Sequence, residues 1–551
     1  MLALLFILSV GLFVVAYLVY GPFLDRTMKI DDKNKTPAET LNDNQDYVPT
    51  NPSVLLGHHF SSIAGAGPVV GPITAANLFG WLPAYIWVVI GSIFVGGVHD
   101  YTSIVASIRH KGLSIGEVVR EWIGERGKKL FLIFTWLALV LVVAVFAELA
   151  AQTLSQESAV GFSSTCYVFL AILFGLAIYR MKMPLWLATV IAVPLLYLAL
   201  IAGEYWPWLD QLFTVNISTW RLILLVYIFI ASVLPVWVLL QPRDYLSSFL
   251  LYGSVIVGAI GMVFGKFDTT HLAAFKSFKA ANGDLLWPIL FVTVACGAIS
   301  GFHSLVGSGT TSKQIRKESD AKMIGYGGML LEGVVATIAI GTVIIWSGWA
   351  APGSTFNPMG IYGAGLGRFA ELIGIPAKLG TAFGLLALNS FILTSLDTAT
   401  RLARYQLQEL FNLKDKYVAT VIGIVFAAYL IFFKSGNTPM WSIIWPIFGS
   451  ANQLVAGLAL LAVSVWLIRG LGKNATFTLI PFVFMTVTTI ASLIILVYNK
   501  LTRTPPVYVL GITGIVLIIL AVWLVYEAFV VLSKPAPPIS AKGGAKAAKA
   551  R

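Results

Sequence analysis

The segment His58–Pro72 reads HHFSSIAGAGPVVGP, and the interpretation of the whole chain starts from it. It lies in an apolar stretch, yet it carries three glycines and two prolines within eight residues. Both residue types interrupt helices, so we expect a helix to break near Gly65–Pro68. Non-helical backbone survives at membrane depth only where it is enclosed by protein or lines a cavity. The segment therefore predicts a broken membrane helix.

A second segment, Gly297–Thr311, reads GAISGFHSLVGSGTT and interrupts another apolar stretch with glycine and serine. Paired interrupted helices in the two halves of a chain are the best sequence indication of a transporter binding site. The alternative is that both segments are packing kinks, because glycine and proline are common in membrane helices. We expect the two breaks to line one site in the middle of the membrane.

Composition places the chain among membrane proteins. Of its 551 residues, 58% are hydrophobic and 11% are charged, which is too little charge for a water-facing surface. The net charge of +12 lies in short loops between apolar stretches, so we expect no nucleic-acid partner. Cys166 and Cys296 each lie in an apolar stretch and are interpreted as small core residues. No phosphate-binding loop and no nucleophile–base pattern is present, so no enzyme is expected.

The apolar stretches predict an all-α polytopic membrane protein with about 15 transmembrane helices. The expected spans are 2–20, 56–78, 82–108, 129–154, 162–180, 185–203, 220–239, 246–264, 285–308, 323–350, 377–399, 416–434, 440–468, 476–498 and 507–532. Of the 37 lysines and arginines, 28 lie on the side of the C-terminus and 9 on the other side. This bias predicts a cytoplasmic C-terminus and an N-terminus outside.

The two broken spans are the second and the ninth, so they cross the membrane in opposite directions. An inverted repeat requires that relation. The expected organisation is a peripheral helix and polar loop (1–55), a first inverted repeat (56–205), an inserted hairpin (206–284), a second inverted repeat (285–470), peripheral helices (471–533) and a disordered basic tail (534–551).

The segment His58–Pro68 resembles a hallmark of the carbon starvation A (CstA) family. Further segments similar to this family are Gly301–Ser304, Gly309–Lys313, Gly97–Tyr101, Leu396–Arg401 and Trp445–Leu454. The resemblance covers about residues 1–500. It implies an inner-membrane importer of pyruvate or peptides, with proton-coupled pyruvate uptake in close relatives. It also implies the leucine-transporter-like 5+5 inverted repeat of the amino acid–polyamine–organocation superfamily.

The substrate site is expected at the two breaks. Helix ends exposed there carry free N–H groups and dipoles that favour anions, as a monocarboxylate or a peptide C-terminus would require. The candidate substrate-binding residues are Gly65, Ala66, Gly67, Pro68, Ser300, Gly301, His303, Ser304 and Asn452. Close packing is the alternative, and Asn452 with Gln453 equally suits a hydrogen-bonded lock between helices.

Ion coupling is expected on the span 377–399 and at buried acids. In the resembled fold this span supplies hydroxyl oxygens to a sodium site, together with carbonyls of the first broken helix. The candidates for the cation or a coupling proton are Ala64, Thr394, Ser395, Thr398, Asp397, Glu148 and Glu332. The alternatives are hydroxyls bonded to their own helix and an Asp397–Arg401 ion pair.

His58, His59, His99 and Asp100 lie toward the cytoplasmic side of their spans and are predicted to form a gate. Neighbouring histidines on a helix point about 100° apart, and no His-x-x-x-His pair occurs, so no metal or haem site is expected.

These features together predict a symporter in the cytoplasmic membrane of a prokaryote that imports a small carboxylate, with pyruvate the first candidate. A peptide importer and a membrane-embedded haem or redox subunit are the alternatives. The expected partners are the substrate and membrane lipid, with no bound cofactor beyond a coupling proton or sodium ion. The oligomeric state is left open.

Overall fold

The computed structural model describes residues 1–43, 46–235, 238–350, 355–432, 440–502 and 507–534. These residues form helices and connecting segments, and no strand occurs among them. The N-terminal span comprises α1 (Leu2–Val15), a π-helical turn (Ala16–Tyr20) and α2 (Gly21–Met28). The predicted loop 21–55 is therefore partly wrong, because the first helix continues to Met28 before the short α3 (Pro37–Thr40).

The first half of the bundle begins with a broken span. Its two parts, α4 (Pro52–Ile63) and α5 (Gly67–Phe79), meet at a bend of 46°. The Asn51 side chain caps the start of α4 by accepting a hydrogen bond from the Ser53 N–H. The following helices are α6 (Trp81–Gly91), a π-helical turn (Ser92–Gly96), α7 (Gly97–Arg109), α8 (Ile115–Trp122), α9 (Glu125–Gln156), α10 (Ser158–Tyr179), α11 (Leu185–Tyr205), α12 (Pro207–Leu212), α13 (Ile217–Val233) and α14 (Leu240–Phe264).

The second half also begins with an interrupted span. It consists of α15 (Leu286–Thr293), a 3-10 turn (Ala295–Gly297) and α16 (Gly301–Gly309). The remaining elements are a π-helical turn (Lys322–Tyr326), α17 (Gly327–Ile344), α18 (Pro358–Ala370), α19 (Ala377–Phe411), α20 (Lys416–Phe432), α21 (Met440–Arg469), α22 (Thr476–Thr502) and α23 (Tyr508–Ser533).

The chain is a multi-pass membrane protein. Eleven of the described helices are long and apolar enough to cross a membrane, and the bent pair α4–α5 makes a twelfth. Two shorter apolar helices, α13 and α20, have 17 residues each. These fourteen spans become the predicted fifteen only if α15 and α16 together form one more broken span. The total of about fifteen therefore stays a prediction.

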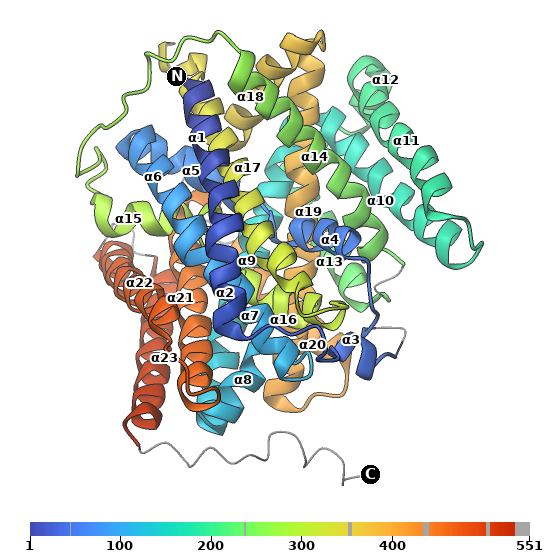
Figure 1. The fold of residues 1–551 in the computed structure, drawn as a ribbon. Coiled ribbons are helices and arrows are strands. Elements are labelled where there is room, and N and C mark those ends of the chain that lie inside the picture. Colours follow the sequence, from blue (N-terminus) through green and yellow to red (C-terminus); the bar gives the residue numbers. More distant parts are fainter. Residues whose placement is uncertain (44–45, 236–237, 351–354, 433–439, 503–506, 535–551) are drawn as a thin grey trace.

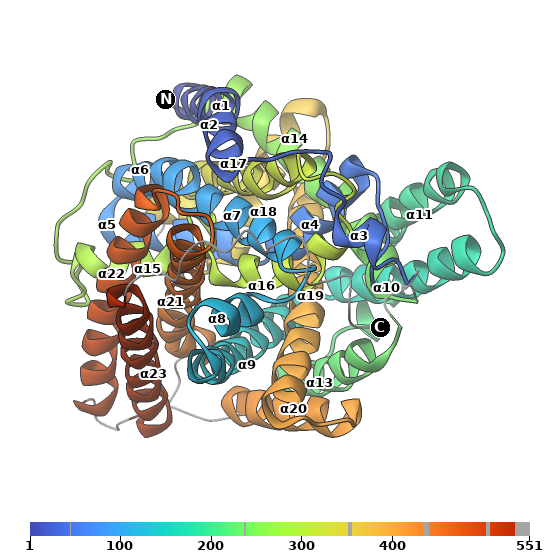
Figure 2. The ribbon, with the colours of Figure 1, turned by 60° about the horizontal axis from the view of Figure 1, so that its bottom comes forward.

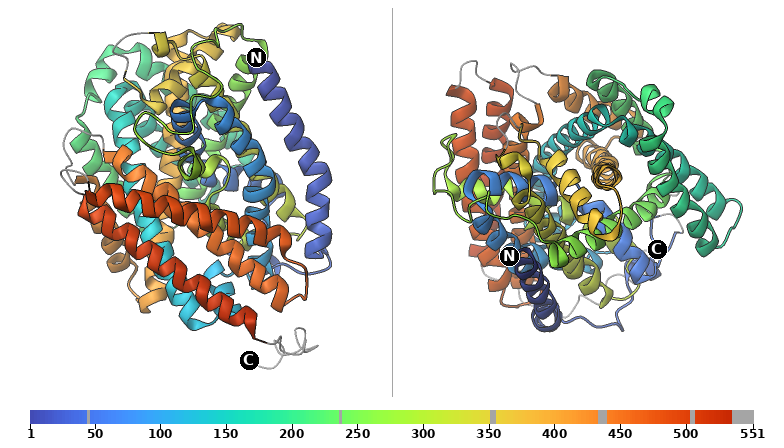
Figure 3. Two further views of the ribbon diagram at one scale, coloured as in Figure 1. Left: turned by 90° about the vertical axis from the view of Figure 1, so that its left-hand side faces the viewer. Right: turned by 90° about the horizontal axis from the view of Figure 1, so that it is seen from above.

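The most buried membrane spans contain α21, α19, α17 and α9. In the most apolar 18-residue window of each helix, the buried share is 94% in α21 and 89% in α19, against 22% in α11 and in α23. Figure 1 shows α10–α12 at one edge of the bundle and α22–α23 at the other, and the turned view in Figure 2 agrees. Figure 3 shows α1 running along the outside of the molecule. The site described below lies among the deep helices.

Some predicted boundaries are wrong for identifiable reasons. The stretch predicted as one span over 323–350 ends as a helix at Ile344, and α18 follows as a separate helix. The Gly-rich part of the second broken segment is helical, because the interruption lies at 294–300 and α16 continues to Gly309. Membrane helices tolerate glycine, so glycine content alone placed this break several residues too late. The predicted tail 534–551 lies outside the described residues apart from Lys534.

Candidate binding site at the two helix breaks

The two breaks lie directly against each other. A Cβ on Gly297 would lie 3.5 Å from the Pro68 Cα atom and 3.3 Å from the Pro72 side chain. A Cβ on Gly71 would lie 2.5 Å from the Thr293 carbonyl oxygen. A side chain at Gly71 would force the two backbones apart, so glycine is required there by close approach, and the longer Gly297 distances show that the two breaks are in contact. The predicted meeting of segments 65–72 and 297–309 is present in the structure.

Four helix ends converge at this place. The N-termini of α5 and α16 and the C-termini of α4 and α15 all lie at the breaks. A helix N-terminus carries partial positive charge and free N–H groups, whereas a C-terminus carries free carbonyls. Gly65, Ala66, Gly67 and Pro68 form or adjoin the first break, and Ser300 and Gly301 adjoin the second. The arrangement can therefore hold an anion and a cation close together.

Asn452 on α21 fixes the start of α16. Its Oδ1 accepts a hydrogen bond of 2.9 Å from the Phe302 N–H, and its Nδ2 donates to Ser300 Oγ at 3.0 Å. The neighbouring Gln453 donates from Nε2 to the Phe291 carbonyl on α15 at 2.5 Å. Ser304 Oγ instead donates to the Gly301 carbonyl of its own helix. Of the two roles considered for Asn452 and Gln453, these contacts match the lock between helices.

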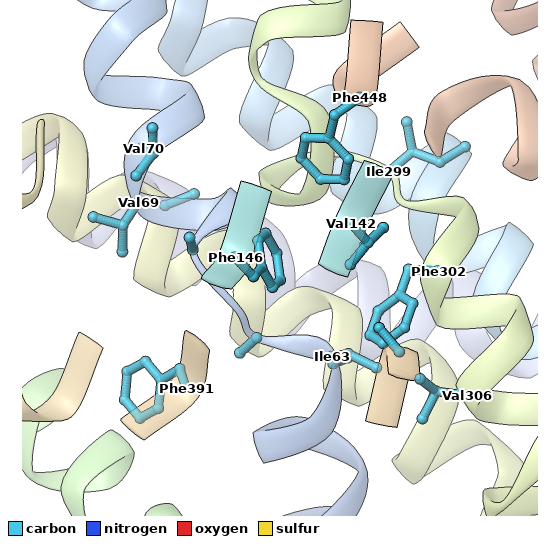
Figure 4. Close-up of a cluster of buried hydrophobic side chains, with 14 of the residues drawn as sticks. Ile63, Val69, Val70, Val142, Phe146, Ile299, Phe302, Val306, Phe391 and Phe448 are labelled. Atoms are coloured by element: carbon cyan, nitrogen blue, oxygen red, sulfur yellow. The ribbon is translucent and has the colours of Figure 1, made fainter. Parts of the chain in front are cut away.

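Apolar side chains enclose the breaks. Figure 4 shows Phe146 of α9 beside the connection between α4 and α5, with Phe448 of α21 close to it. The Phe146 and Phe448 rings are 5.7 Å apart between centroids. A Cβ on Gly65 would lie 2.7 Å from Phe146 and 2.8 Å from Ser395 Oγ, so both residues border the first break. Sequence reasoning missed Phe146, because one aromatic residue in an apolar helix has no distinguishing signal.

One of the predicted hydroxyl ligands lies at the first break. Ser395 Oγ on α19 donates to the Ser62 carbonyl at 3.1 Å, two residues before Ala64. Thr394 instead donates to the Ser390 carbonyl of its own helix at 3.0 Å. This bond matches the alternative interpretation, in which the hydroxyls bond to their own helix. Thr398 Oγ1 is buried and has no partner among the described residues. The structure thus brings Ser395, but not Thr394, onto α4.

The buried acids on α9 and α19 have cationic partners. Glu148 forms two hydrogen bonds with Arg221 of α13, at 2.7 and 2.6 Å, and accepts a third from Gln152 at 3.1 Å. Asp397 pairs with Arg243 of α14, and Tyr227 also donates to it at 2.7 Å. Asp397 is not paired with Arg401, which donates to the Ala231 and Leu234 carbonyls instead.

Arg243 belongs to a polar cluster that sequence reasoning missed. We call it the Arg243 cluster: His58, Ser62, Arg243, Asp244 and Asp397. Asp244 lies 3.6 Å from Arg243 Nη2, 3.2 Å from His58 Nδ1 and 3.4 Å from Ser62 Oγ. The cluster therefore connects the first broken helix to α14 and α19. The signal was adjacent opposite charges, Arg243-Asp244, which lie in the N-terminal turns of α14 and before the predicted span 246–264.

A second polar cluster, which we call the His303 cluster, surrounds the start of α16 and consists of His99, Asp100, His303 and Glu332. His303 Nδ1 lies 2.7 Å from Asp100 of α7, and His303 Nε2 lies 3.1 Å from Glu332 of α17. Asp100 also contacts His99 Nδ1 at 2.7 Å, and the Ile63 backbone reaches the His303 ring. Figure 1 shows α7 and α16 close together in the lower half of the bundle, with α17 labelled above them. The predicted substrate residue His303 and the predicted proton carrier Glu332 thus lie side by side.

The four predicted gate residues divide between two environments. His58 borders a cavity of about 1020 Å³ whose basic lining residues are Arg180, Arg401, Arg404 and Lys416. Arg404 and Lys416 also donate to carbonyls at the end of α13, so their charge stabilises that helix terminus. His59 is buried with Nδ1 2.8 Å from Thr311 Oγ1, and His99 and Asp100 lie in the His303 cluster. Only His58 contacts the cavity.

Comparison with known proteins identifies the family. The family described as "Carbon starvation protein CstA" matches residues 1–350 and 350–492. A "Peptide transporter CstA" from Campylobacter jejuni is 32% identical, over 88% of this chain and 79% of that protein. One of the same name from Bacillus subtilis is 33% identical, over 88% of each chain.

A third relative has a different named activity. The "Pyruvate/proton symporter BtsT" of Escherichia coli is 32% identical, over 84% of this chain and 76% of that protein. Among solved structures, a mutant manganese transporter of Eremococcus coleocola is similar with a TM-score of 0.49 and 14% identity, over 89% of this chain and 98% of that one. The family match and the identities above show that the chain belongs to the carbon starvation protein CstA family.

Proposed function

We propose that this chain is a secondary-active symporter that imports a small carboxylate, first of all pyruvate, across the cytoplasmic membrane of a prokaryote. The observation that carries the proposal is the convergence of the α5 and α16 N-termini inside the protein. Two oriented helix N-termini suit a monocarboxylate. The relative named as a pyruvate/proton symporter supports the same substrate class.

The substrate carboxylate is proposed to bind at Gly65–Pro68 and Ser300–Gly301. Free N–H groups at Ala66, Gly67 and Gly301 would donate to it, while Phe146 would cover its apolar part. The close apolar packing of the breaks supports a small substrate, because Phe146 already lies against Gly65. Alternating access would open the site toward the cavity beside His58.

The Arg243 cluster supports proton coupling. Arg243, Asp244 and Asp397 are completely buried, and they carry one positive and two negative charges. An excess negative charge is costly inside a membrane protein, and one proton on Asp244 or His58 would remove it. His58 borders the cavity, so this proton would have a route to water. If sodium is the coupling ion instead, we propose that it binds where Ser395 Oγ meets the Ser62 carbonyl.

Helix packing supports a 5+5 inverted repeat with a new division. The helices α9, α13, α19 and α20 all pack on one another, as two corresponding pairs would. The repeats would then be α4–α5, α6–α7, α9, α13 and α14, followed by α15–α16, α17, α19, α20 and α21. This division makes α10–α11 the inserted hairpin, whereas the sequence prediction placed it at 206–284.

Uptake into proteoliposomes tests the function. Labelled pyruvate, alanine and a dipeptide would be offered under an imposed proton gradient, sodium gradient or neither. We expect pyruvate to accumulate under an inward proton gradient. If neither the proton gradient nor the sodium gradient drives uptake of any of the three substrates, the protein is not a symporter for them.

A peptide importer is the second candidate. The names of the relatives from C. jejuni and B. subtilis favour it. Accumulation of the dipeptide without pyruvate in the same experiment would establish it. The haem or redox alternative has no support from these relatives, and a Soret band of the purified protein would be needed to revive it.

A further inference from the structure

Three side chains with metal-ligating atoms meet at the second break. Cys296 lies in the 3-10 turn, His303 in α16 and Glu332 in α17, and all three are buried. One ligand atom from each lies within 4.8 Å of the others. Cys296 lies in the second break and His303 just after it, and Glu332 lies on the next helix. The fold brings the three side chains together.

Hydrogen bonding within the protein does not account for the facing atoms of His303 and Glu332. His303 Nε2 and both carboxylate oxygens of Glu332 have no hydrogen-bond partner among the described residues. The 3.1 Å separation between His303 Nε2 and Glu332 Oε2 therefore lacks hydrogen-bond geometry. Buried polar atoms without partners are costly and require an explanation. A bound ion between the atoms supplies one.

The His303–Glu332 separation fits a tetrahedral site, and the Cys296 sulfur lies within 4.8 Å of both ligand atoms. Zinc binds nitrogen and oxygen at about 2.0–2.2 Å and sulfur at about 2.3 Å, which puts neighbouring ligand atoms about 3.3–3.6 Å apart. The observed His303–Glu332 distance of 3.1 Å is close to this value. A small inward movement of the Cys296 thiol completes three corners.

Asp100 holds His303 in the orientation that a metal requires. His303 Nδ1 and Asp100 Oδ2 are 2.7 Å apart, so Nδ1 can carry the proton and leave the Nε2 lone pair free. A carboxylate behind a ligating histidine is the usual outer support of a zinc site. Ser300 and Asn452 lie 3.4 and 3.6 Å from the Cys296 sulfur, and both can donate to a thiolate.

A divalent ion balances the charge of the two anionic ligands, and the Asp100 carboxylate behind His303 adds a further negative charge that favours a cation here. A thiolate and a carboxylate together carry two negative charges, and a divalent cation neutralises them. Neutrality is the condition for burying ionised groups inside a membrane protein. Sulfur and imidazole ligands favour zinc and its late-transition-metal neighbours, whereas sodium, magnesium and calcium prefer oxygen.

We propose that Cys296 Sγ, His303 Nε2 and a carboxylate oxygen of Glu332 bind a divalent transition-metal ion of the zinc class. The ion joins the break between α15 and α16 to α17, and it leaves a fourth coordination position open. The site is independent of which substrate the protein carries. It departs from the sequence prediction of no metal, which compared only histidines neighbouring along one helix.

Metal analysis of the purified full-length protein tests the site. The protein would be incubated with Zn²⁺, passed through a desalting column and analysed by mass spectrometry for metal per chain. We expect about one zinc ion in the wild type and less than a tenth of that in Glu332→Gln, which keeps the side-chain volume. Cys166→Ser is the matched control, because Cys166 lies in α10 away from the site, and it should retain the zinc.

Co²⁺ provides a second measurement that reports on the sulfur ligand. We expect a thiolate-to-cobalt charge-transfer band in the wild type and in Cys166→Ser, and its loss in Cys296→Ser. Elution as a single species in size-exclusion chromatography checks that each variant is folded. Stoichiometric zinc in Glu332→Gln, or a wild type without zinc and without the cobalt band, would overturn the proposal.

Discussion

Gly65 has no room for a side chain. Its Cβ would lie 2.7 Å from Phe146 and 2.8 Å from Ser395 Oγ, and neither neighbour belongs to the same helix. Overpacking of this kind costs about 1–3 kcal/mol, and here the displaced atoms would belong to the proposed substrate site. The glycine is therefore a requirement of the site as well as of the bend.

We expect Gly65→Ala to reduce pyruvate uptake at least tenfold, and Gly67→Leu to abolish it, while both proteins still reach the membrane. Gly423→Ala is the control, because nothing lies within 4 Å of the added atom. Uptake in proteoliposomes, normalised to incorporated protein, gives the comparison. Wild-type uptake by Gly67→Leu would mean that the break has only a structural role.

Asp244 offers a test of coupling separate from binding. Asp244→Asn removes one negative charge from the Arg243 cluster, so Arg243 and Asp397 balance without a proton. We expect gradient-driven accumulation to fall to the equilibrium level, while exchange of labelled for unlabelled pyruvate continues. Asp268→Asn, in an exposed loop, should behave as the wild type. Unchanged proton-driven accumulation in Asp244→Asn would exclude this cluster as the coupling site.

The sodium alternative makes a different prediction at residue scale. If sodium drives uptake, Ser395→Ala should remove the dependence on sodium, because Ser395 contacts the Ser62 carbonyl. Thr394→Ala should have little effect, because its hydroxyl bonds within α19. Uptake measured across a range of sodium concentrations distinguishes the two variants. Equal sodium dependence in the wild type and in Ser395→Ala would show that Ser395 is not part of a sodium site.

At the scale of elements, the short α16 depends on α21 for its start. Asn452→Ala would leave the buried Phe302 N–H without its acceptor and Ser300 without its donor. An unsatisfied buried group costs about 1–3 kcal/mol, so we expect a lower thermal unfolding midpoint. Asn282→Ala, in an exposed loop, is the control. Scanning fluorimetry in detergent measures both variants, and equal midpoints would show that the contact contributes nothing.

Elements were predictable from the sequence to different degrees. The break in α4–α5 follows from local glycine and proline chemistry, and it was placed within two residues. The break before α16 was placed too late, because the conformation at 294–300 is set by contact with α5 and by Asn452. The helices α8 and α18 were missed, since both are shorter than a membrane span.

Partners of buried charged residues were beyond the sequence. The alternative considered for Asp397 was an ion pair with Arg401, one turn along the same helix, but Asp397 pairs with Arg243, which lies 154 positions away in the chain. Local spacing gives candidate pairs on one helix, whereas the tertiary fold decides which cation is reached. Cys296 was interpreted as a core residue for the same reason, since Glu332 and His303 approach it only in the folded bundle.

At the scale of the whole molecule, the charge distribution predicts the orientation in the membrane. A cysteine replacing the exposed Glu125 should lie in the cytoplasm, and one replacing the exposed Asp268 should lie outside. In a Cys166→Ser background, a membrane-impermeant maleimide added to intact cells should label only the second. Labelling of the Glu125→Cys variant in intact cells would show that the orientation is opposite to the predicted one.

The two π-helical turns at Ser92–Gly96 and Lys322–Tyr326 have a mechanical consequence. A π-helical turn inserts one extra residue into a helix and is frequent at functional sites. Here the Tyr326 hydroxyl of one turn donates to the Ile93 carbonyl of the other at 3.2 Å. This hydrogen bond ties the two turns together, so we expect a displacement of one turn to be transmitted to the other.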